Sequence, residues 1–211
     1  MTEILEFIII VILALTALRA LSATVRRMVL LVKLSVLSRD TGATLRIHSF
    51  PFLSFFRLSR TPEITLRTEN TVYLIRTYNG GGIGKVVHFA AEGFTVRFSR
   101  LRTASYKLVK RQNAGGGNMM ARGGFGVGVK VKLLPKLEVP REIESSDYRI
   151  VKVLIFNPAA GDVSYVTEER TSINVAYTGD RVYDDLIFTA TTFVNHVDRE
   201  VRRRRELAAH R

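Results

Sequence analysis

The first forty residues begin with a nearly unbroken apolar run, which then gives way to mixed apolar and basic positions. Residues 7–18 carry no charge, and the only charged residues between Ile4 and Val25 are Glu6 and Arg19, toward the two ends of the stretch. A helix that crosses a bilayer needs about 20 apolar residues, and charged side chains near its ends can extend to the headgroups. Residues 1–25 are therefore predicted to form a transmembrane anchor.

The charges around this run predict its orientation. Glu3 and Glu6 precede its uncharged centre, whereas Arg19, Arg26 and Arg27 follow it. A cleavable signal peptide would carry a positive N-terminal region instead. By the positive-inside rule, an uncleaved anchor in the cell membrane places the N-terminus outside and the rest of the chain in the cytoplasm. The alternative interpretation is a buried helix of a soluble protein, because such a helix can also be apolar on all sides.

The segment after the anchor, residues 26–42, combines apolar positions with regularly spaced cations. Arg19, Arg26 and Lys33 lie seven residues apart and so share one face of a helix. A basic amphipathic helix lies in the headgroup region, so this juxtamembrane segment is predicted to contact anionic lipids. Because no Gly or Pro separates it from the anchor, the alternative is one long helix.

From residue 43 the chain shows short stretches that alternate apolar and polar residues, which is typical of strands with one solvated face. Residues 79–82, Asn-Gly-Gly-Gly, predict a hairpin between the strands on either side, and residues 157–161 predict a second turn before a hairpin. The predicted fold class is mainly β, with an antiparallel β-sandwich or barrel-like sheet in a domain of residues 43–211. The predicted strands cover residues 44–48, 64–67, 71–78, 85–90, 94–98, 126–134, 149–156, 162–167 and 186–191.

A C-terminal helix is predicted over about residues 191–207. Phe193, Val197 and Val201 recur every four residues, and Thr191 or Thr192 is the expected N-cap. Four arginines at residues 202–205 end this helix, where cations offset the negative end of the helix dipole. The same arginines also suit the phosphates of lipid or nucleic acid.

The charge balance adds a candidate surface for anionic partners. The chain has 32 Lys and Arg against 19 Asp and Glu, a formal charge of +13, which attracts anionic lipid headgroups or nucleic acid. Between residues 97 and 111, basic side chains are interleaved with apolar and aromatic ones; this pattern lets bases stack but also occurs in an ordinary basic hairpin. The candidate contact residues are Arg26, Arg27, Lys33, Arg97, Arg100, Arg102, Lys107, Lys110, Arg111, Arg202, Arg203, Arg204 and Arg205.

Apolar content predicts a packed core, because 46% of the residues are hydrophobic. The segment Phe50–Phe56 holds four phenylalanines in seven residues. These rings are expected either to pack beneath the first hairpin or to insert into the membrane interface. A second glycine-rich stretch, residues 115–128, is predicted to be a long loop in which Met119, Met120 and Phe125 are available to a partner.

Few residues are candidates for catalytic chemistry. The loop Gly80–Lys85 has the Gly-Lys pair of a phosphate-binding loop, but Val86 stands where Ser or Thr would bind Mg²⁺. Asp180, Asp184 and Asp185 are weak candidates for a divalent-metal site, because carboxylate oxygens suit such ions. The four histidines lack metal-binding spacing and there is no cysteine, so neither a zinc site nor a cofactor is expected.

These patterns favour a single-pass membrane-anchored binding or scaffold protein without enzymatic activity. Its basic β-rich domain would hold another protein, or a second copy of itself, at the cytoplasmic face. The alternative is a membrane-associated binder of nucleic acid or anionic lipid, for which strong salt dependence is the expected signature. A third and weaker hypothesis is a metal-dependent hydrolase that uses the three aspartates.

Overall fold

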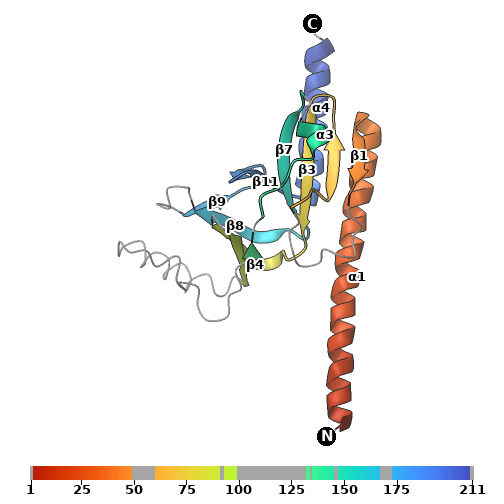
Figure 1. Cartoon of the computed structure of the whole chain (residues 1–211), viewed down its shortest axis with the longest axis vertical. Coiled ribbons are helices and arrows are strands. Elements are labelled where there is room, and N and C mark those ends of the chain that lie inside the picture. Colours follow the sequence, from red (N-terminus) through yellow and green to blue (C-terminus); the bar gives the residue numbers. More distant parts are fainter. Residues whose placement is uncertain are drawn as a thin grey trace, which may run out of the picture.

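A computed structural model of the chain describes residues 2–48, 60–90, 93–98, 132–133, 135–144, 147–166 and 173–209. A long N-terminal helix extends far beyond a strand-rich body, and a second helix lies beside its C-terminal part (Figure 1). The elements in chain order are α1 (Thr2–Thr41), β1 (Thr44–Ile47), β2 (Ile64–Arg67), β3 (Thr71–Tyr78), β4 (Gly82–Ala90), β5 (Gly93–Phe98), β6 (Lys132–Leu133), α3 (Arg141–Glu144), β7 (Arg149–Phe156), β8 (Ala160–Val166), β9 (Ile173–Ala176), β10 (Arg181–Val182), β11 (Asp185–Thr189) and α4 (Ala190–Ala209).

The strands form two mixed sheets. The larger sheet has six strands in the order β1-β2-β3-β7-β11-β10, and the smaller sheet has five in the order β6-β5-β4-β8-β9. Three pairs, β3 with β7, β7 with β11, and β4 with β8, are parallel, and the other pairs are antiparallel. The predicted β-rich domain is confirmed, but an all-antiparallel or barrel-like sheet is wrong. Alternation reports which face of a strand is buried and carries no information on the direction of its neighbour.

The predicted hairpin at residues 79–82 is also wrong, because this turn carries the chain from the larger sheet to the smaller one, and the predicted turn at residues 157–161 makes the same crossing. β3 pairs with β7 along its whole length, and β4 then pairs with β8. Between these pairs the Asn157 N–H donates to the Tyr78 carbonyl and the Gly82 N–H to the Ala159 carbonyl, each at 3.0 Å. A Cβ on Gly81 would lie 2.1 Å from the Pro158 carbonyl oxygen. Glycine is thus required for the close approach of these crossings.

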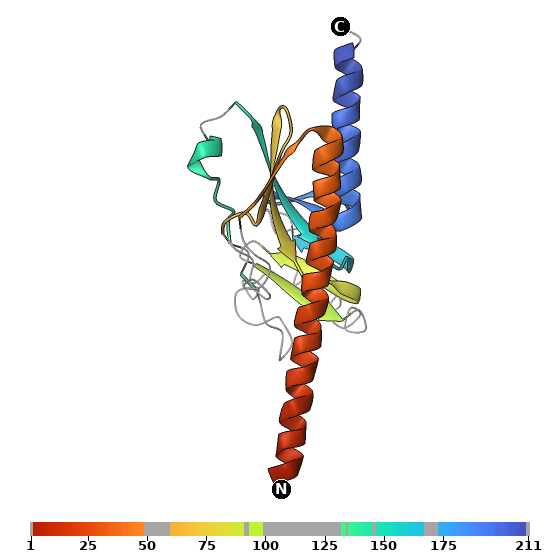
Figure 2. The ribbon, with the colours of Figure 1, turned by 90° about the vertical axis from the view of Figure 1, so that its right-hand side faces the viewer.

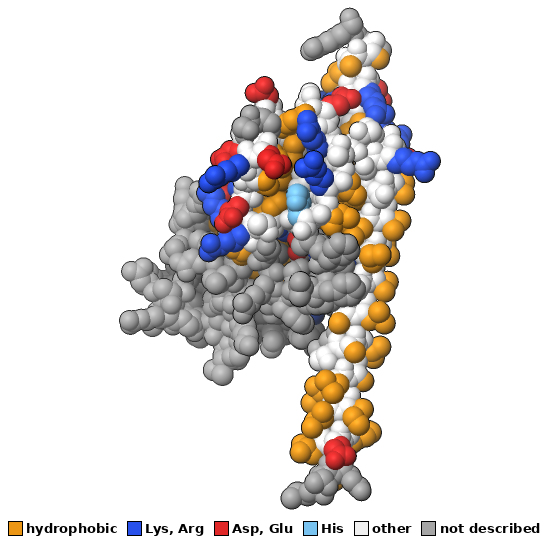
Figure 3. All heavy atoms as spheres, turned by 45° about the vertical axis from the view of Figure 1, so that its right-hand side comes forward, with side chains coloured by type: hydrophobic (Ala, Val, Ile, Leu, Met, Phe, Trp, Pro, Cys, Tyr) orange, Lys and Arg blue, Asp and Glu red, His pale blue; other side chains and the backbone are white. Residues whose placement is uncertain are grey.

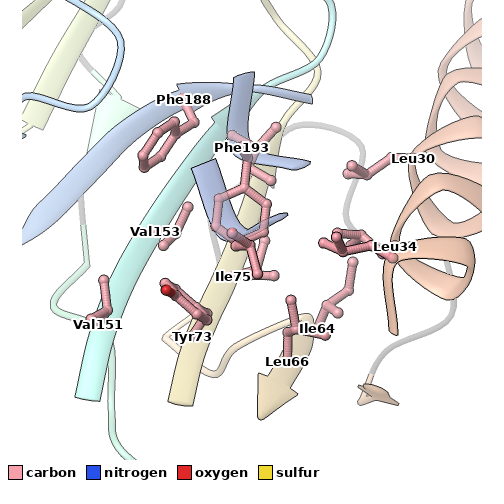
Figure 4. Close-up of a cluster of buried hydrophobic side chains, with 13 residues drawn as sticks. Leu30, Leu34, Ile64, Leu66, Tyr73, Ile75, Val151, Val153, Phe188 and Phe193 are labelled. Carbon is pink, nitrogen blue, oxygen red and sulfur yellow. The ribbon is translucent and has the colours of Figure 1, made fainter. Parts of the chain in front are cut away.

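One face of the larger sheet is covered by α1 and α4. Figure 4 shows Leu30 and Leu34 of α1 on the side that faces the sheet, with Phe193 of α4 beside them and Ile64 and Leu66 of β2 below. Tyr73, Ile75, Val151, Val153, Ile155, Phe188, Val197 and Leu37 complete this buried cluster. Fully burying one such side chain stabilises the fold by about 1.5–3 kcal/mol, so the C-terminal half of α1 is a structural part of the domain.

The two helices partly match their predicted bounds. The anchor and the juxtamembrane segment are one continuous helix, which is the alternative that the absence of Gly and Pro left open. The C-terminal helix is confirmed, but its N-cap is Thr189 rather than Thr191 or Thr192. The hydroxyl of Thr189 accepts the N–H of Thr192 at 3.3 Å, and the hydroxyl of Thr192 accepts the N–H of Thr189 at 2.9 Å. This reciprocal pair has the geometry of a capping box.

Candidate functional site: the N-terminal helix and its junction with the sheet

The N-terminal half of α1 contacts no other described part of the chain. All side chains from Ile4 to Leu18 are exposed, although nearly all of them are apolar. Residues 4–22 form a rod of about 28 Å at 1.5 Å per residue, close to the roughly 30 Å of a bilayer's hydrocarbon core. By length and composition, α1 is able to cross a membrane.

The C-terminal half of α1 buries a single face against the domain. Buried positions recur every three or four residues, as expected for one side of a helix. The members of this buried face are Ala23, Arg27, Leu30, Leu34, Leu37 and Thr41. The presence of an arginine in this row is unusual, because a buried charge is costly unless it is paired.

Arg27 is paired with Glu63, immediately before β2. The guanidinium Nη2 lies 2.8 Å from Glu63 Oε2, and the side chains are only 3% and 2% exposed. The Thr77 hydroxyl of β3 donates to the same carboxylate oxygen at 2.5 Å. An ion pair in this environment is tolerated only with good geometry and additional hydrogen bonds. It therefore fixes the rotation and height of α1 on the sheet.

Further polar contacts hold the backbone of α1 from both sides. Asn157, at the crossing between the sheets, donates its Nδ2 to the Arg26 carbonyl at 2.9 Å. Arg205 of α4 donates to the Thr41 carbonyl at 2.7 Å, and so satisfies one of the free carbonyls at the end of α1. Lys33 donates to the Thr191 hydroxyl at 3.1 Å. The two helices thus run side by side in the same direction (Figure 2).

A second buried ion pair lies on the opposite face of the sheet. Arg76 of β3 donates to Asp185 of β11 and, at 2.6 Å, to the Pro135 carbonyl. Burial raises the pKa of Asp185, and the attraction of Arg76 opposes this rise without cancelling it. The pair links β3, β11 and the segment before α3, which is a structural role.

Tyr73 and Glu200 connect α4 to the centre of the sheet. The Tyr73 hydroxyl donates to Glu200 Oε2 at 2.5 Å, and Arg204 donates to Oε1 at 2.6 Å. Burial raises the pKa of Tyr73, and its bond to Glu200 raises it further. Burial alone would raise the pKa of Glu200, but the hydrogen bonds from Tyr73 and Arg204 outweigh it and lower that pKa.

The three aspartates proposed for a metal site have separate partners. Asp180 accepts the Tyr177 N–H at 2.8 Å within a turn, Asp184 lies 3.4 Å from Lys152, and Asp185 is buried beside Arg76. Across the described ranges, no three acidic or histidine side chains are grouped closely enough to hold a metal ion. The described geometry gives this hypothesis no support.

Most of the candidate basic residues whose side chains the structure describes interact with other residues of the protein. Besides Arg27, Lys33 and Arg205, the side chain of Arg202 pairs with Asp198 at 3.0 Å and that of Arg204 with Glu200. Arg203 is exposed, and Arg26 is half-buried. The others, Arg97, Arg100, Arg102, Lys107, Lys110 and Arg111, lie outside the described side chains, as do the aromatic segment Phe50–Phe56 and residues 115–128.

Sequence reasoning missed the partners of α1, namely Glu63, Thr77 and Asn157. Each is a single polar residue at the edge of a strand, with no local signal of its role. The spacing of Arg27 with Leu30, Leu34 and Leu37 did contain a signal, because a cation in the row of a helix's apolar positions requires a buried anion. Comparisons of the chain with protein-family models, curated proteins and solved structures find no match.

Proposed function

We propose that this protein is a single-pass membrane protein that holds a β-rich binding or scaffold domain rigidly at the cytoplasmic face. The observation that carries the proposal is the double use of α1: its first half is bare and apolar, and its second half is part of the domain core. An uninterrupted helix with a buried ion pair at its junction transmits the orientation of the span to the domain. Such a domain has a fixed height and direction relative to the bilayer.

The proposed orientation follows from charge. Arg19, Arg26, Lys33 and Arg39 lie at or beyond the end of the bare half, whereas Glu3 and Glu6 lie at its start. Cations on short flanking segments favour the cytoplasmic side. Tyr177, which is 72% exposed on the domain, is a suitable labelling position. In a chain without cysteine, a Tyr177→Cys variant should react with an impermeant maleimide only after the cells are permeabilised, whereas Thr2→Cys should react in intact cells.

Membrane extraction of a charged variant tests the anchoring. Ile9→Asp with Ile12→Asp places two carboxylates in the bare half, where neither side chain contacts the domain. Each carboxylate at the centre of a span costs about 2.5–3.5 kcal/mol on insertion scales. The wild type should resist washing with alkaline carbonate, and the variant should be released. Val175→Asp with Tyr177→Asp, on the exposed domain surface, is the matched control and should stay bound.

A truncation that tests the anchoring must keep the residues of α1 that belong to the core. A chain that starts at Thr41 loses Leu30, Leu34, Leu37 and Arg27, so it should unfold as well as leave the membrane. A chain that starts at Leu21 retains all of these contacts and loses only the bare half. Folded, soluble protein from this second truncation, and wild type that resists extraction, are the expected results. Release of the wild type by high salt alone would overturn the proposal.

A further inference from the structure

The face of α1 that points away from the sheet is apolar beyond the length that a bilayer can cover. Between Leu21 and Val36 the exposed positions carry no charge; they are Leu21, Ser22, Val25, Met28, Val29, Val32, Ser35 and Val36. The large hydrophobic side chains among them are 50–61% exposed. Figure 3 shows hydrophobic side chains along α1 from near its N-terminal end up to the level of the domain.

This outer face cannot be explained by the bilayer alone. From Ile4 to Val36 the apolar face runs for 33 residues, or about 50 Å, against a hydrocarbon core of roughly 30 Å. From Ala23 onward the opposite side of the same helix is packed on the domain. Since α1 is continuous, about 20 Å of its apolar face must stand outside the hydrocarbon once the bare half spans it. An apolar face of this length in water indicates a protein partner.

The spacing on this face is that of a coiled coil. Positions separated alternately by three and four residues form one seam, Leu18, Leu21, Val25, Met28, Val32 and Ser35, and the same spacing continues back through the span to Ile4. The seam lies opposite the buried row, so it is free while the domain is folded. In heptad terms Leu18, Val25 and Val32 occupy position a. β-branched residues at a favour two-stranded parallel coils.

We propose that this seam binds the same seam of a second copy of the chain, as a parallel two-helix coiled coil. The inference rests on the anchoring proposed above, because two chains inserted in the same direction already hold their α1 helices parallel. A two-fold axis along the membrane normal then brings identical patches together. The nearby cations Arg26 and Lys33 lie at the side of the helix and are half-buried, so their charges do not face each other across the seam. The seam ends at Ser35, because the next position of the same spacing is the exposed Arg39.

The absence of cysteine in the chain makes a cross-linking scan clean. Single variants Val25→Cys, Met28→Cys, Val32→Cys and Ser35→Cys are placed in the full-length protein in membranes and oxidised with copper phenanthroline. We expect covalent dimers at all four positions. Lys33→Cys, one position after the seam residue Val32, and Tyr177→Cys, on the exposed domain surface, should cross-link several-fold less.

A disrupting variant supplies the second readout. Val25→Asp with Val32→Asp puts four carboxylates into the seam of a dimer, so Ser35→Cys in this background should lose its cross-link. The bare half is unchanged, and this chain should still resist carbonate extraction. Ile9→Asp with Ile12→Asp changes the bare half instead, and this variant should be released from the membrane by alkaline carbonate.

The outcomes separate the two proposals. A wild-type chain that resists extraction but cross-links equally at seam and control positions, or only to other proteins, overturns the self-association and leaves the anchoring intact. Cross-linking that persists in the Val25→Asp/Val32→Asp background also overturns it. Release of the wild type from the membrane overturns the anchoring, and the parallel pairing with it.

Discussion

The two halves of α1 differ in charge and have opposite relations to the rest of the protein: residues 4–18 carry one charged side chain, whereas residues 22–41 carry five. Residues 4–18 are exposed on every side, whereas the second half buries Leu30, Leu34 and Leu37 at 0–5% exposure. The second half also makes ordered polar contacts, with Arg27 at their centre. No bend or break separates the halves. One helix therefore serves two environments: its first half is apolar and exposed on every side, and its second half has cations and a buried row on the domain.

This difference suggests how the domain is held. A domain attached through a flexible linker would be free to rotate, whereas here the rotation is fixed by Arg27 and the height by the leucine row. The strength of that junction can be measured by breaking its contacts one at a time. The expected effects decrease from the buried charge, through the buried leucines, to the second helix beside them.

The largest effect is expected from Arg27→Ala. This change removes the guanidinium that pairs with the buried carboxylate of Glu63. Removing one member of a buried pair costs about 3–5 kcal/mol of unfolding free energy. Denaturant unfolding of the full-length protein in detergent micelles, followed by circular dichroism, provides the measurement. Arg39→Ala, at an exposed position of the same helix, should change the stability by less than about 0.5 kcal/mol.

The double variant Arg27→Met/Glu63→Gln separates charge from packing. It removes both charges while keeping groups of similar size, and the glutamine still accepts the Thr77 hydroxyl. We expect it to recover most of the stability that Arg27→Ala loses. If the double variant were as unstable as the single one, the loss would come from packing, and the ion pair would not be the main element of the junction.

An intermediate effect is expected from Leu34→Ala. Leu34 is 0% exposed and lies in the core cluster, and truncating a buried leucine costs about 2–5 kcal/mol, depending on how far the site relaxes. Val36→Ala, two residues later on the outer face, should change the same unfolding free energy by less than about 0.5 kcal/mol. Equal costs for the two variants would mean that the outer face is also packed in the folded protein.

The sequence predicted local elements well where the pattern itself carries the information. The strands at residues 64–67, 71–78 and 149–156 match those of the structure to the residue, because their burial alternates or runs continuously between clear turn residues. The short elements β9, β10 and α3 were missed. Each covers only two to four residues, which is too short for a periodic pattern to emerge.

The arrangement of those elements could not be read from the sequence. The turns at Asn79–Gly82 and Asn157–Gly161 have the composition of tight turns, yet each crosses between sheets, because the neighbouring strand comes from 76 to 78 residues away in the chain. The junction has the same character: Arg27, Glu63 and Asn157 are separated by long stretches of chain, and only the folded sheet brings them together. The long outer seam, by contrast, is present in the sequence as a heptad spacing, but it becomes informative only once the opposite face is known to be buried.

The smallest effect concerns α4, the second helix on the same sheet face. Hydrogen bonds from Tyr73 and Arg204 hold the pKa of Glu200 below its ordinary value of 4.5, although burial acts in the other direction. A lowered pKa in the folded state means that the ionised form stabilises the fold above pH 4.5, and that this contribution is lost as the pH falls through the lowered value. Because Glu200 is partly exposed, its contribution should be at most about 1 kcal/mol.

The stability difference between wild type and Glu200→Gln, measured by denaturant unfolding from pH 7 to pH 3, should therefore shrink toward zero at the acidic end. A difference that is constant with pH would mean that Glu200 contributes without its charge and that α4 is held on the sheet by Phe193 and Val197. A difference that grows on acidification would mean that the pKa of Glu200 is raised in the folded state, contrary to this prediction.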